Sequence, residues 1–378
     1  MLITRHIMLS VVLLTLLLPS ICVAFHVQPH PLEPKCAYVS GLTIPVQDES
    51  TKADLLTQFK KTPLMIFTKQ QRVSPIEFQD FLTIFDSHCD KQALLDPESH
   101  LDQVLQPFDF VPGLKHIAPR GNFKATNWKG VESLHVKPVP PFIDNHVWHC
   151  DLHAHATKIP NVVTGFQVLR QPLYGANTDF VSGTTIHDHL NPHQKKAASQ
   201  ILMEISRAAF LDREYFDYGG VNILSDVRED LPVTQVPLLV GSDADPCVIL
   251  QPTFTKRIVG MNHGNSAQWV RNFMIQHVLP HRFTVQWKAG DIGVFNNRQF
   301  MHSSTPATHY LNFAGANTRL LLQVFLPTTR QQEFTVYPED AKSLLLTDWC
   351  KLDRVARAVS YARRNWNCKL PNTVVCKI

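Results

Sequence analysis

The sequence predicts a mainly β protein in which a sandwich or barrel core is covered by helices. Short runs rich in β-branched and aromatic residues recur through the middle of the chain, and helical spacing is concentrated in segments between them. The 378 residues are enough to bury a large core, and no internal repeat divides them. A formal net charge of +4 is too small to indicate a nucleic-acid partner.

Residues 1–24 are predicted to be a secretory signal peptide. Arg5 lies in a short basic start, an apolar run extends from Ile7 to Leu18, and the small residue Ala24 marks a cleavage site. The apolar run is short for a membrane span, which needs roughly 20 residues, although an uncleaved anchor is the alternative. We therefore expect a protein of the secretory pathway, in the ER lumen or outside the cell, with no stable membrane span after cleavage.

The first third of the mature chain begins with the proline-punctuated, extended segment HVQPHPLEPK. The apolar run 63–70 predicts a buried strand. A helix is expected over 74–85, because Ser74 can cap it, Pro75 suits its first turn and Glu77 completes a capping box. Residues 90–135 are rich in Pro, Gly and His, and we expect loops there.

The second part of the domain alternates strands and helices. We expect a β-branched strand, a helix opened by Asn191 and Pro192, a second helix, a hairpin around the turn KAGD, and a last buried strand. In order, these elements cover residues 161–170, 193–210, 266–279, 283–296 and 319–326.

The remaining residues, 331–378, are predicted to form a cysteine-rich tail with two short helices. Seven cysteines follow the leader, an odd number, so at least one is free or pairs with another molecule. Three of them lie in the tail (Cys350, Cys368 and Cys376), where we expect disulfides.

The segment DNHVWHCDLHAHATKIP carries the strongest chemical signal. His149 and Asp151 lie at positions i and i+2, so on a strand both side chains point to the same face. Together with a distant histidine such as His302, they would form two histidines and one carboxylate on one face of a metal, an arrangement suited to Fe(II) and oxygen. Arg319 opens the last apolar strand, where a buried arginine needs an anionic partner such as a ligand carboxylate.

Several blocks, in order along the chain, resemble the TauD/TfdA-type dioxygenases, which depend on Fe(II) and 2-oxoglutarate. The resemblance covers roughly residues 40–330 and implies a double-stranded β-helix, a jelly roll with flanking helices. The blocks are PLMIFTKQQRVSPIEFQDF, WHCD, PLYGANTDFVSG, FTKRIVG and AGDIGVFNNRQFMHSST.

The resemblance implies roles for five residues. His149, Asp151 and His302 match the family's iron ligands, Thr178 matches a threonine that helps to hold 2-oxoglutarate, and Arg319 matches the arginine that binds its distal carboxylate. The implied reaction uses Fe(II), 2-oxoglutarate and O2 to hydroxylate a small organic substrate, with release of succinate and CO2. The spacing from His302 to Arg319 is several residues longer than in the bacterial taurine enzyme.

The substrate positions depart from the taurine enzyme. Gln323 lies four residues after Arg319, where that enzyme has its sulfonate-binding arginine, and Lys137 replaces a substrate-contacting histidine. Taurine is therefore not the expected substrate. Further candidates for the pocket are the polar residues Asn145 and His153 and the apolar residues Leu152 and Phe254.

Two other readings stay open at this level. The segment DLHAH is similar to the H-x-H that opens zinc-dependent amidohydrolase barrels, but it lies in mid-chain rather than on a first strand. A secreted binding protein could also keep the fold without catalysis. The sequence does not indicate an oligomeric state.

Overall fold

The computed structural model describes residues 25–95, 111, 114, 116–121, 124–128, 131–135, 148–151, 160–173, 175–205, 233–241, 245–252, 254–305 and 319–330. The predicted leader, the tail and most of the histidine-rich segment lie outside these ranges. The strands are β1 (His26–His30), β2 (Glu33–Ser40), β3 (Leu64–Phe67), β4 (Ile117–Gly121), β5 (Lys124–Trp128), β6 (Val131–His135), β7 (Val163–Arg170), β8 (Thr178–Ser182), β9 (Leu202–Ile205), β10 (Thr234–Pro237), β11 (Leu239–Val240), β12 (Cys247–Val248), β13 (Thr255–Ile258), β14 (Phe283–Val285), β15 (Ile292–Asn296), β16 (Phe300–Ser304) and β17 (Leu320–Phe325). The helices are α2 (Glu49–Lys61), α3 (Pro75–Leu82), η1 (Thr83–Phe85), α4 (Lys91–Leu95), α6 (Gly183–His189), α7 (Pro192–Ala198), α8 (His263–Phe273), the π-helix η2 (Met274–Val278) and η3 (Leu279–His281).

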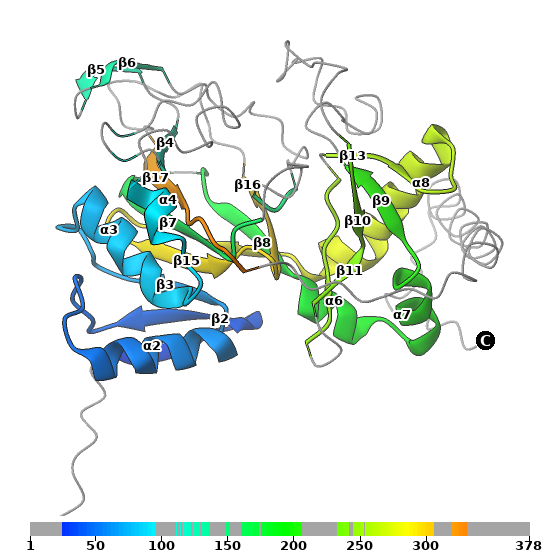
Figure 1. The fold of residues 1–378 in the computed structure, drawn as a ribbon, viewed down its shortest axis with the longest axis horizontal. Helices are drawn as coiled ribbons and strands as arrows, with labels where there is room; N and C mark the ends of the chain where they lie inside the picture. Colours follow the sequence, from blue (N-terminus) through cyan, green and yellow to red (C-terminus); the bar gives the residue numbers. More distant parts are fainter. Residues whose placement is uncertain are drawn as a thin grey trace, which may run out of the picture.

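Two sheets form the centre of the molecule. The larger has seven strands in the order β1-β2-β3-β15-β7-β17-β4, antiparallel except for the β2–β3 pair, and the smaller has the order β14-β8-β16 (Figure 1). An aromatic core joins them, since Phe166 and Phe295 of the large sheet pack with Phe180, Phe283 and Phe300 of the small one. The predicted mainly β class is confirmed, and the two sheets are consistent with a double-stranded β-helix.

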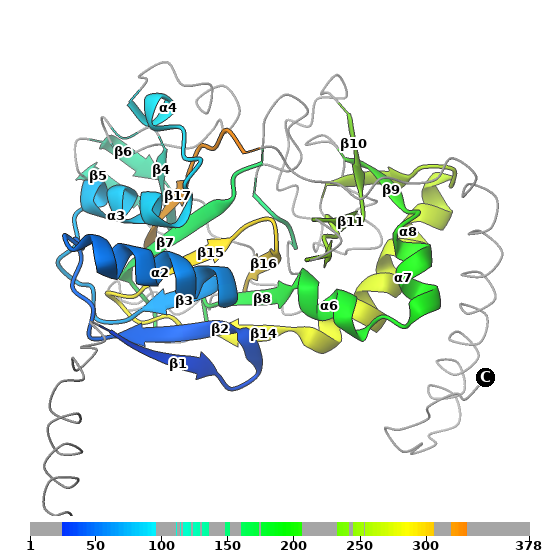
Figure 2. The same ribbon diagram turned by 60° about the horizontal axis from the view of Figure 1, so that its bottom comes forward.

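The alternation of side chains along β15 shows how the large sheet is covered on both faces. Phe295 faces the aromatic core, whereas its neighbour Val294 packs on the opposite face with residues of α2 and α3 (Figure 2). The capping box of α3 forms as predicted, with Ser74 Oγ accepting from Glu77 N and the Glu77 side chain accepting from Ser74 N. The helical layer therefore leaves the other face of the sheet for the small sheet and the site.

A second lobe, built from α6, α7, α8 and strands β9 to β13, extends from the small sheet (Figure 1). Here the predicted helix over 193–210 is wrong from Ser199 to Ile205, and its residues 206–210 lie outside the described ranges. The capping box between Asn191 and Gln194 starts α7 as expected, but β9 follows it and pairs with both β10 and β13. Backbone pairing on two sides outweighs the helical periodicity of this segment.

The predicted hairpin over 283–296 is also wrong, although both strands exist. The turn forms, with Asp291 N donating to Lys288 O at 3.0 Å, but β14 pairs with β8 while β15 pairs with β3 and β7. The turn therefore carries the chain from one sheet to the other.

The expectation of loops over 90–135 is wrong in part. The segment contains α4, β4, β5 and β6. Strand β4 includes Pro119 and pairs with β17 at the edge of the large sheet, where a residue without an N–H is tolerated.

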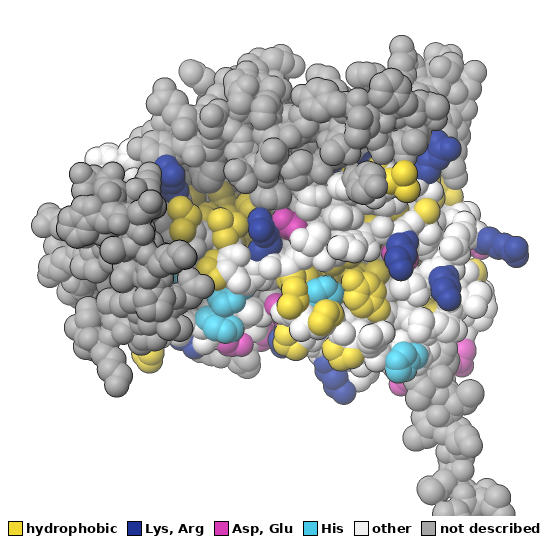
Figure 3. Space-filling view, turned by 180° about the vertical axis from the view of Figure 1, so that it is seen from behind, with side chains coloured by type: hydrophobic (Ala, Val, Ile, Leu, Met, Phe, Trp, Pro, Cys, Tyr) yellow, Lys and Arg dark blue, Asp and Glu magenta, His cyan; other side chains and the backbone are white. Residues whose placement is uncertain are grey.

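Among the described residues, no helix is both long and apolar enough to cross a membrane. Cys36, Cys89, Cys150 and Cys247 are free thiols, while the three tail cysteines lie outside the described ranges. Seen from behind, the described surface has scattered Lys and Arg side chains (Figure 3).

Candidate metal centre

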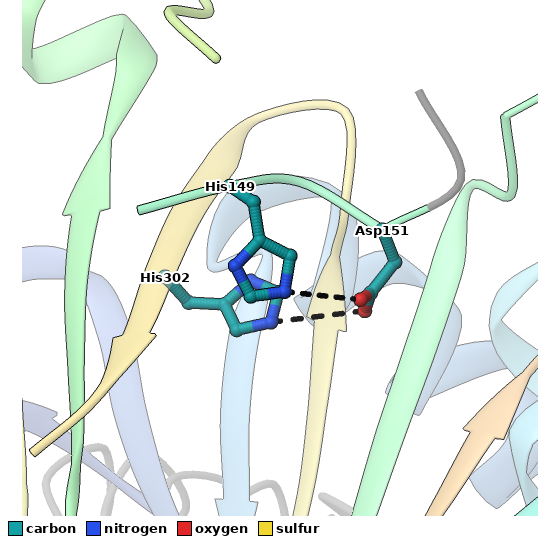
Figure 4. Close-up of side chains that lie close together, drawn as sticks. All are labelled: His149, Asp151 and His302. Atoms are coloured by element: carbon teal, nitrogen blue, oxygen red, sulfur yellow. Dashed lines mark ion pairs between the residues drawn. The ribbon is translucent and has the colours of Figure 1, made fainter. Parts of the chain in front are cut away.

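The structure brings the three predicted metal ligands together from distant parts of the chain. His149 and His302 form an antiparallel bridge, with His149 N donating to His302 O at 3.1 Å and His302 N donating to His149 O at 2.9 Å. Asp151 follows two residues after His149. One ligand atom from each of the three residues lies within 4.8 Å of the others, and both imidazole rings face the carboxylate (Figure 4).

Both ring nitrogens that face Asp151 are Nε2 atoms. The distances are 3.5 Å from His149 Nε2 to Asp151 Oδ1 and 3.7 Å from His302 Nε2 to Asp151 Oδ2. Asp151 and His302 are buried, whereas His149 is partly exposed and lies at the open side of the cluster.

A buried asparagine fixes the backbone of the acidic ligand. Asn297, in the turn between β15 and β16, accepts a hydrogen bond from Asp151 N at 2.7 Å and donates one to Asp151 O at 2.8 Å. Its amide also donates to Asn161, which precedes β7. The Asp151 segment is thereby attached to the large sheet although it belongs to no long strand.

The electrostatics favour a neutral imidazole beside an ionised carboxylate. Burial lowers the pKa of His302 to about 3, so the ring keeps its lone pair at neutral pH. Burial alone would raise the pKa of Asp151, but the neighbouring histidines and Arg120 lower it to about 2. Since His302 is neutral at pH 7, we attribute the low pKa of Asp151 mainly to the charge of Arg120. Burial lowers the pKa of Arg120 to about 10, so it is still a cation at this pH.

The two residues predicted to hold 2-oxoglutarate, Thr178 and Arg319, both lie beside Ser304 of β16. Ser304 lies two residues after His302 on β16 and is paired in register with Thr178 of β8. The Arg319 guanidinium donates to Ser304 Oγ through Nη1 at 3.4 Å. A two-residue step on a strand spans about 6.5 Å, which is comparable with the length of an extended five-carbon diacid.

A tryptophan orients the threonine of this end. Trp287 Nε1 donates to Thr178 Oγ1 at 2.8 Å, and both side chains are buried. A hydroxyl oxygen that accepts this bond can still donate its own proton to a carboxylate. Arg319 is also buried, and although burial lowers its pKa to about 10, it remains protonated at neutral pH.

The predicted substrate residues are placed only in part. The Phe254 ring meets the His149 ring edge-on, with centroids 6.1 Å apart, so it lies beside the metal ligands. Gln323 is buried, and its amide donates to Asp151 Oδ2 at 3.1 Å. Asn145, Leu152, His153 and Lys137 lie outside the residues that the structure describes.

Three residues of the site are not among those that the sequence predicts: Arg120, Asn297 and Trp287. Asn297 lies within the block AGDIGVFNNRQFMHSST that contains His302, and Trp287 lies two residues before that block, so proximity to the block is a usable signal. Arg120 lies in the segment expected to be loops, and nothing local distinguishes it.

The donor set fits Fe(II). Two neutral imidazoles and one carboxylate suit a divalent ion of intermediate softness, and three protein ligands leave coordination positions for a chelating cosubstrate and oxygen. Arg319 and Thr178 are both buried beside Ser304, and a cation together with a hydroxyl suits the distal carboxylate of such a cosubstrate.

Comparisons with known proteins agree with this geometry. A sequence model described as "Taurine catabolism dioxygenase TauD, TfdA family" matches residues 30–324. Among solved structures, a taurine dioxygenase from Burkholderia xenovorans superposes with a TM-score of 0.57 at 16% identity, covering 86% of this chain and 100% of that one. AAD-2, solved with Mn(II) and N-oxalylglycine, superposes with a TM-score of 0.55 at 13% identity, covering 81% and 98%. No curated protein sequence matches the chain.

Proposed function

The chain belongs to the TauD/TfdA family and is a 2-oxoglutarate-dependent non-haem iron dioxygenase, and from this premise we propose that it hydroxylates a small organic substrate in the secretory pathway. The proposed reaction consumes the substrate, 2-oxoglutarate and O2, and yields the hydroxylated product, succinate and CO2. The observation that carries the proposal is the cluster of His149, Asp151 and His302 beside the Arg319–Thr178 end.

In this proposal the protein supplies position, charge and exclusion of water. His149, Asp151 and His302 would hold Fe(II), which, when bound with its cosubstrate, supplies the oxidising chemistry needed for an unactivated C–H bond. Arg319 and Thr178 bind the distal carboxylate of 2-oxoglutarate. The aromatic residues around His302, among them Phe166 and Phe180, keep water from the inner side.

We place the substrate on the open side of the cluster, beside His149. Phe254 provides an apolar surface there. Gln323 offers no charge, and both ends of its amide are already bonded to Asp151 and Arg120. A sulfonate at this position would lose its hydration, which costs several kcal/mol, and the nearby cation Arg120 is already hydrogen-bonded to Gln323. The proposed substrate is therefore neutral there, or carries its charge elsewhere, and taurine should be poor.

The proposal of a secretory location rests on residues 1–24 alone. Expression of the full chain in eukaryotic cells, followed by N-terminal sequencing of the protein recovered from lumen and medium, tests it. A mature terminus near residue 25 supports cleavage, and full-length protein confined to the cytosol contradicts it.

The activity is tested by anaerobic reconstitution with Fe(II) and 2-oxoglutarate, followed by oxygen and a panel of small metabolites, with succinate as the readout. The matched control is Asp151→Ala. Substrate-stimulated succinate release that Asp151→Ala abolishes supports the proposal. If the protein binds iron but forms no succinate with any compound, the result would favour a non-catalytic binding protein.

The alternative of a zinc-dependent amidohydrolase disagrees with the fold, because the core sheets are mainly antiparallel whereas amidohydrolases have a parallel barrel.

A further inference from the structure

A chain of hydrogen bonds leads from the edge of the large sheet to the acidic metal ligand. Arg120 Nε of β4 donates to Gln323 Oε1 of β17 at 2.8 Å, and Gln323 Nε2 donates to Asp151 Oδ2 at 3.1 Å. In the β4–β17 register, Arg120 lies opposite Leu321, a member of the aromatic core cluster, and Gln323 is two residues further along. Both side chains therefore belong to the inner face of the sheet.

The two charged ends fix the orientation of the amide. A guanidinium can only donate and a carboxylate can only accept, so the Gln323 oxygen must face Arg120 and its nitrogen must face Asp151. A flipped amide would place donor against donor and acceptor against acceptor. The chain is thus polarised in one direction, from a cation through an amide to the ligand carboxylate.

This chain also distinguishes the two carboxylate oxygens. Oδ2 accepts from Gln323 and from Thr164 Oγ1, the latter at 3.2 Å. Each oxygen lies near one histidine, Oδ1 at 3.5 Å from His149 Nε2 and Oδ2 at 3.7 Å from His302 Nε2, so the difference between them is the pair of donors on Oδ2. A carboxylate whose second oxygen is held by two donors cannot rotate without breaking both bonds.

We propose that Arg120 and Gln323 are positioning residues that lock the rotamer of Asp151, so that Oδ1 is presented to the metal and Oδ2 is held by the protein. The inference rests on the proposed function, because it takes Asp151 as a metal ligand. It gives Gln323 a role different from the substrate contact that its sequence position predicts. It also means that the cation near this carboxylate comes from β4 rather than from β17.

Groups that orient metal ligands typically contribute roughly 10- to 100-fold to metal affinity. Gln323→Met keeps the length of the side chain and removes both hydrogen bonds, so its Kd for the metal should rise by roughly that factor. Arg120→Met removes only the outer end of the chain and should weaken binding less. Arg120→Lys, which retains the charge, should recover part of the loss.

The matched control is Gln167→Met. Gln167 is a fully buried glutamine of neighbouring strand β7, but its amide donates to Val73 O at 2.6 Å instead of to a metal ligand. Gln167→Met should lower the melting temperature of the metal-free protein while leaving the metal Kd within about 2-fold of wild type. A general loss of packing would lower metal affinity in both variants alike.

The experiment is anaerobic titration of each variant with Co(II), read by its ligand-field spectrum, alongside thermal unfolding of the metal-free protein. Support requires weaker Co(II) binding and an altered spectrum in Gln323→Met but not in Gln167→Met. Wild-type affinity in both Gln323→Met and Arg120→Met would overturn the inference. If Gln323→Met does not fold, the Co(II) affinity of Arg120→Met, a change at the edge of the sheet, is the test of the inference. Failure of the proposed function looks different: wild type would not bind Co(II), or Asp151→Ala would bind it equally well.

Discussion

Replacing Asn297 by leucine tests whether the backbone of Asp151 is what the metal centre depends on. The Asn297 side chain is fully buried and makes two hydrogen bonds to Asp151, at 2.7 and 2.8 Å. Leucine has a similar volume but can make neither. The variant therefore leaves one N–H and one C=O of Asp151 without their partner.

The expected loss follows from these two groups. A buried polar group left unsatisfied costs about 1–3 kcal/mol, so two cost about 2–6 kcal/mol. Relaxation of the Asp151 segment toward water would reduce the cost to the lower half of that range. The same relaxation would displace the carboxylate, so we expect the Kd for Fe(II) to rise by at least about 10-fold.

Urea unfolding of the metal-free protein measures the loss of stability, and anaerobic titration with Fe(II) measures the change in Kd. The control is Asn296→Ala, the adjacent residue, whose side chain accepts from Arg298 N and does not contact Asp151. The control should change metal affinity by less than about 2-fold, as expected for a side chain outside the ligand network. The reasoning is refuted if Asn297→Leu loses less than about 1 kcal/mol of stability, the smallest penalty for one unsatisfied group, and binds iron like wild type.

Three further changes test other parts of the structure. Arg319→Met should raise the apparent KM for 2-oxoglutarate roughly 30- to 150-fold, the equivalent of about 2–3 kcal/mol, with iron affinity nearly unchanged; steady-state succinate assays measure both effects. Gly293→Ala should raise the same KM and lower the melting temperature, because a Cβ would lie 2.5 Å from Trp287 Cη2 and displace the indole from Thr178; an unchanged KM would separate the indole from cosubstrate binding. Burial lowers the pKa of His277 to about 4, below its value in the unfolded chain, so the folded state is stabilised fully above pH 6.5 and loses this stability as the pH falls toward 4. When urea unfolding is measured at pH 7 and at pH 5, the free energy of unfolding should fall by about 1–2 kcal/mol more in wild type than in His277→Gln.

Elements with a local signal could be predicted from the sequence. The helix α3 carries its own capping box, and β3, β7 and β17 are continuous apolar or β-branched runs that fit only a buried strand. The predictions are wrong where pairing with a strand that is distant in the sequence determines the structure. β9 has helical periodicity but is paired on both sides, and β14 and β15 are joined by a tight turn yet belong to different sheets.

The residues of the candidate site also differ in whether a local pattern predicts them. His149 and Asp151 could be predicted because an H-x-D pair is itself a pattern, and His302 and Thr178 because they stand within blocks that resemble a family. Arg319 could be predicted because it opens the last apolar strand. The groups that hold Asp151 are 146 and 172 residues away from it in the sequence, at Asn297 and Gln323. A single asparagine or glutamine has no distinguishing local pattern, so only the fold shows what it contacts.

Gln323 shows why a position can be matched correctly and its role still differ. Where the taurine enzyme has an arginine, this chain has an amide, which suggests that a cation has been lost. The fold places Arg120 within hydrogen-bonding distance of the same side chain, so the local charge beside Asp151 is retained on a neighbouring strand. Gln323→Arg would then set a second guanidinium against the first in a buried site, where like charges repel strongly. The route to a sulfonate pocket therefore requires the loss of Arg120 as well as the gain of an arginine at 323, and a single substitution does not provide it.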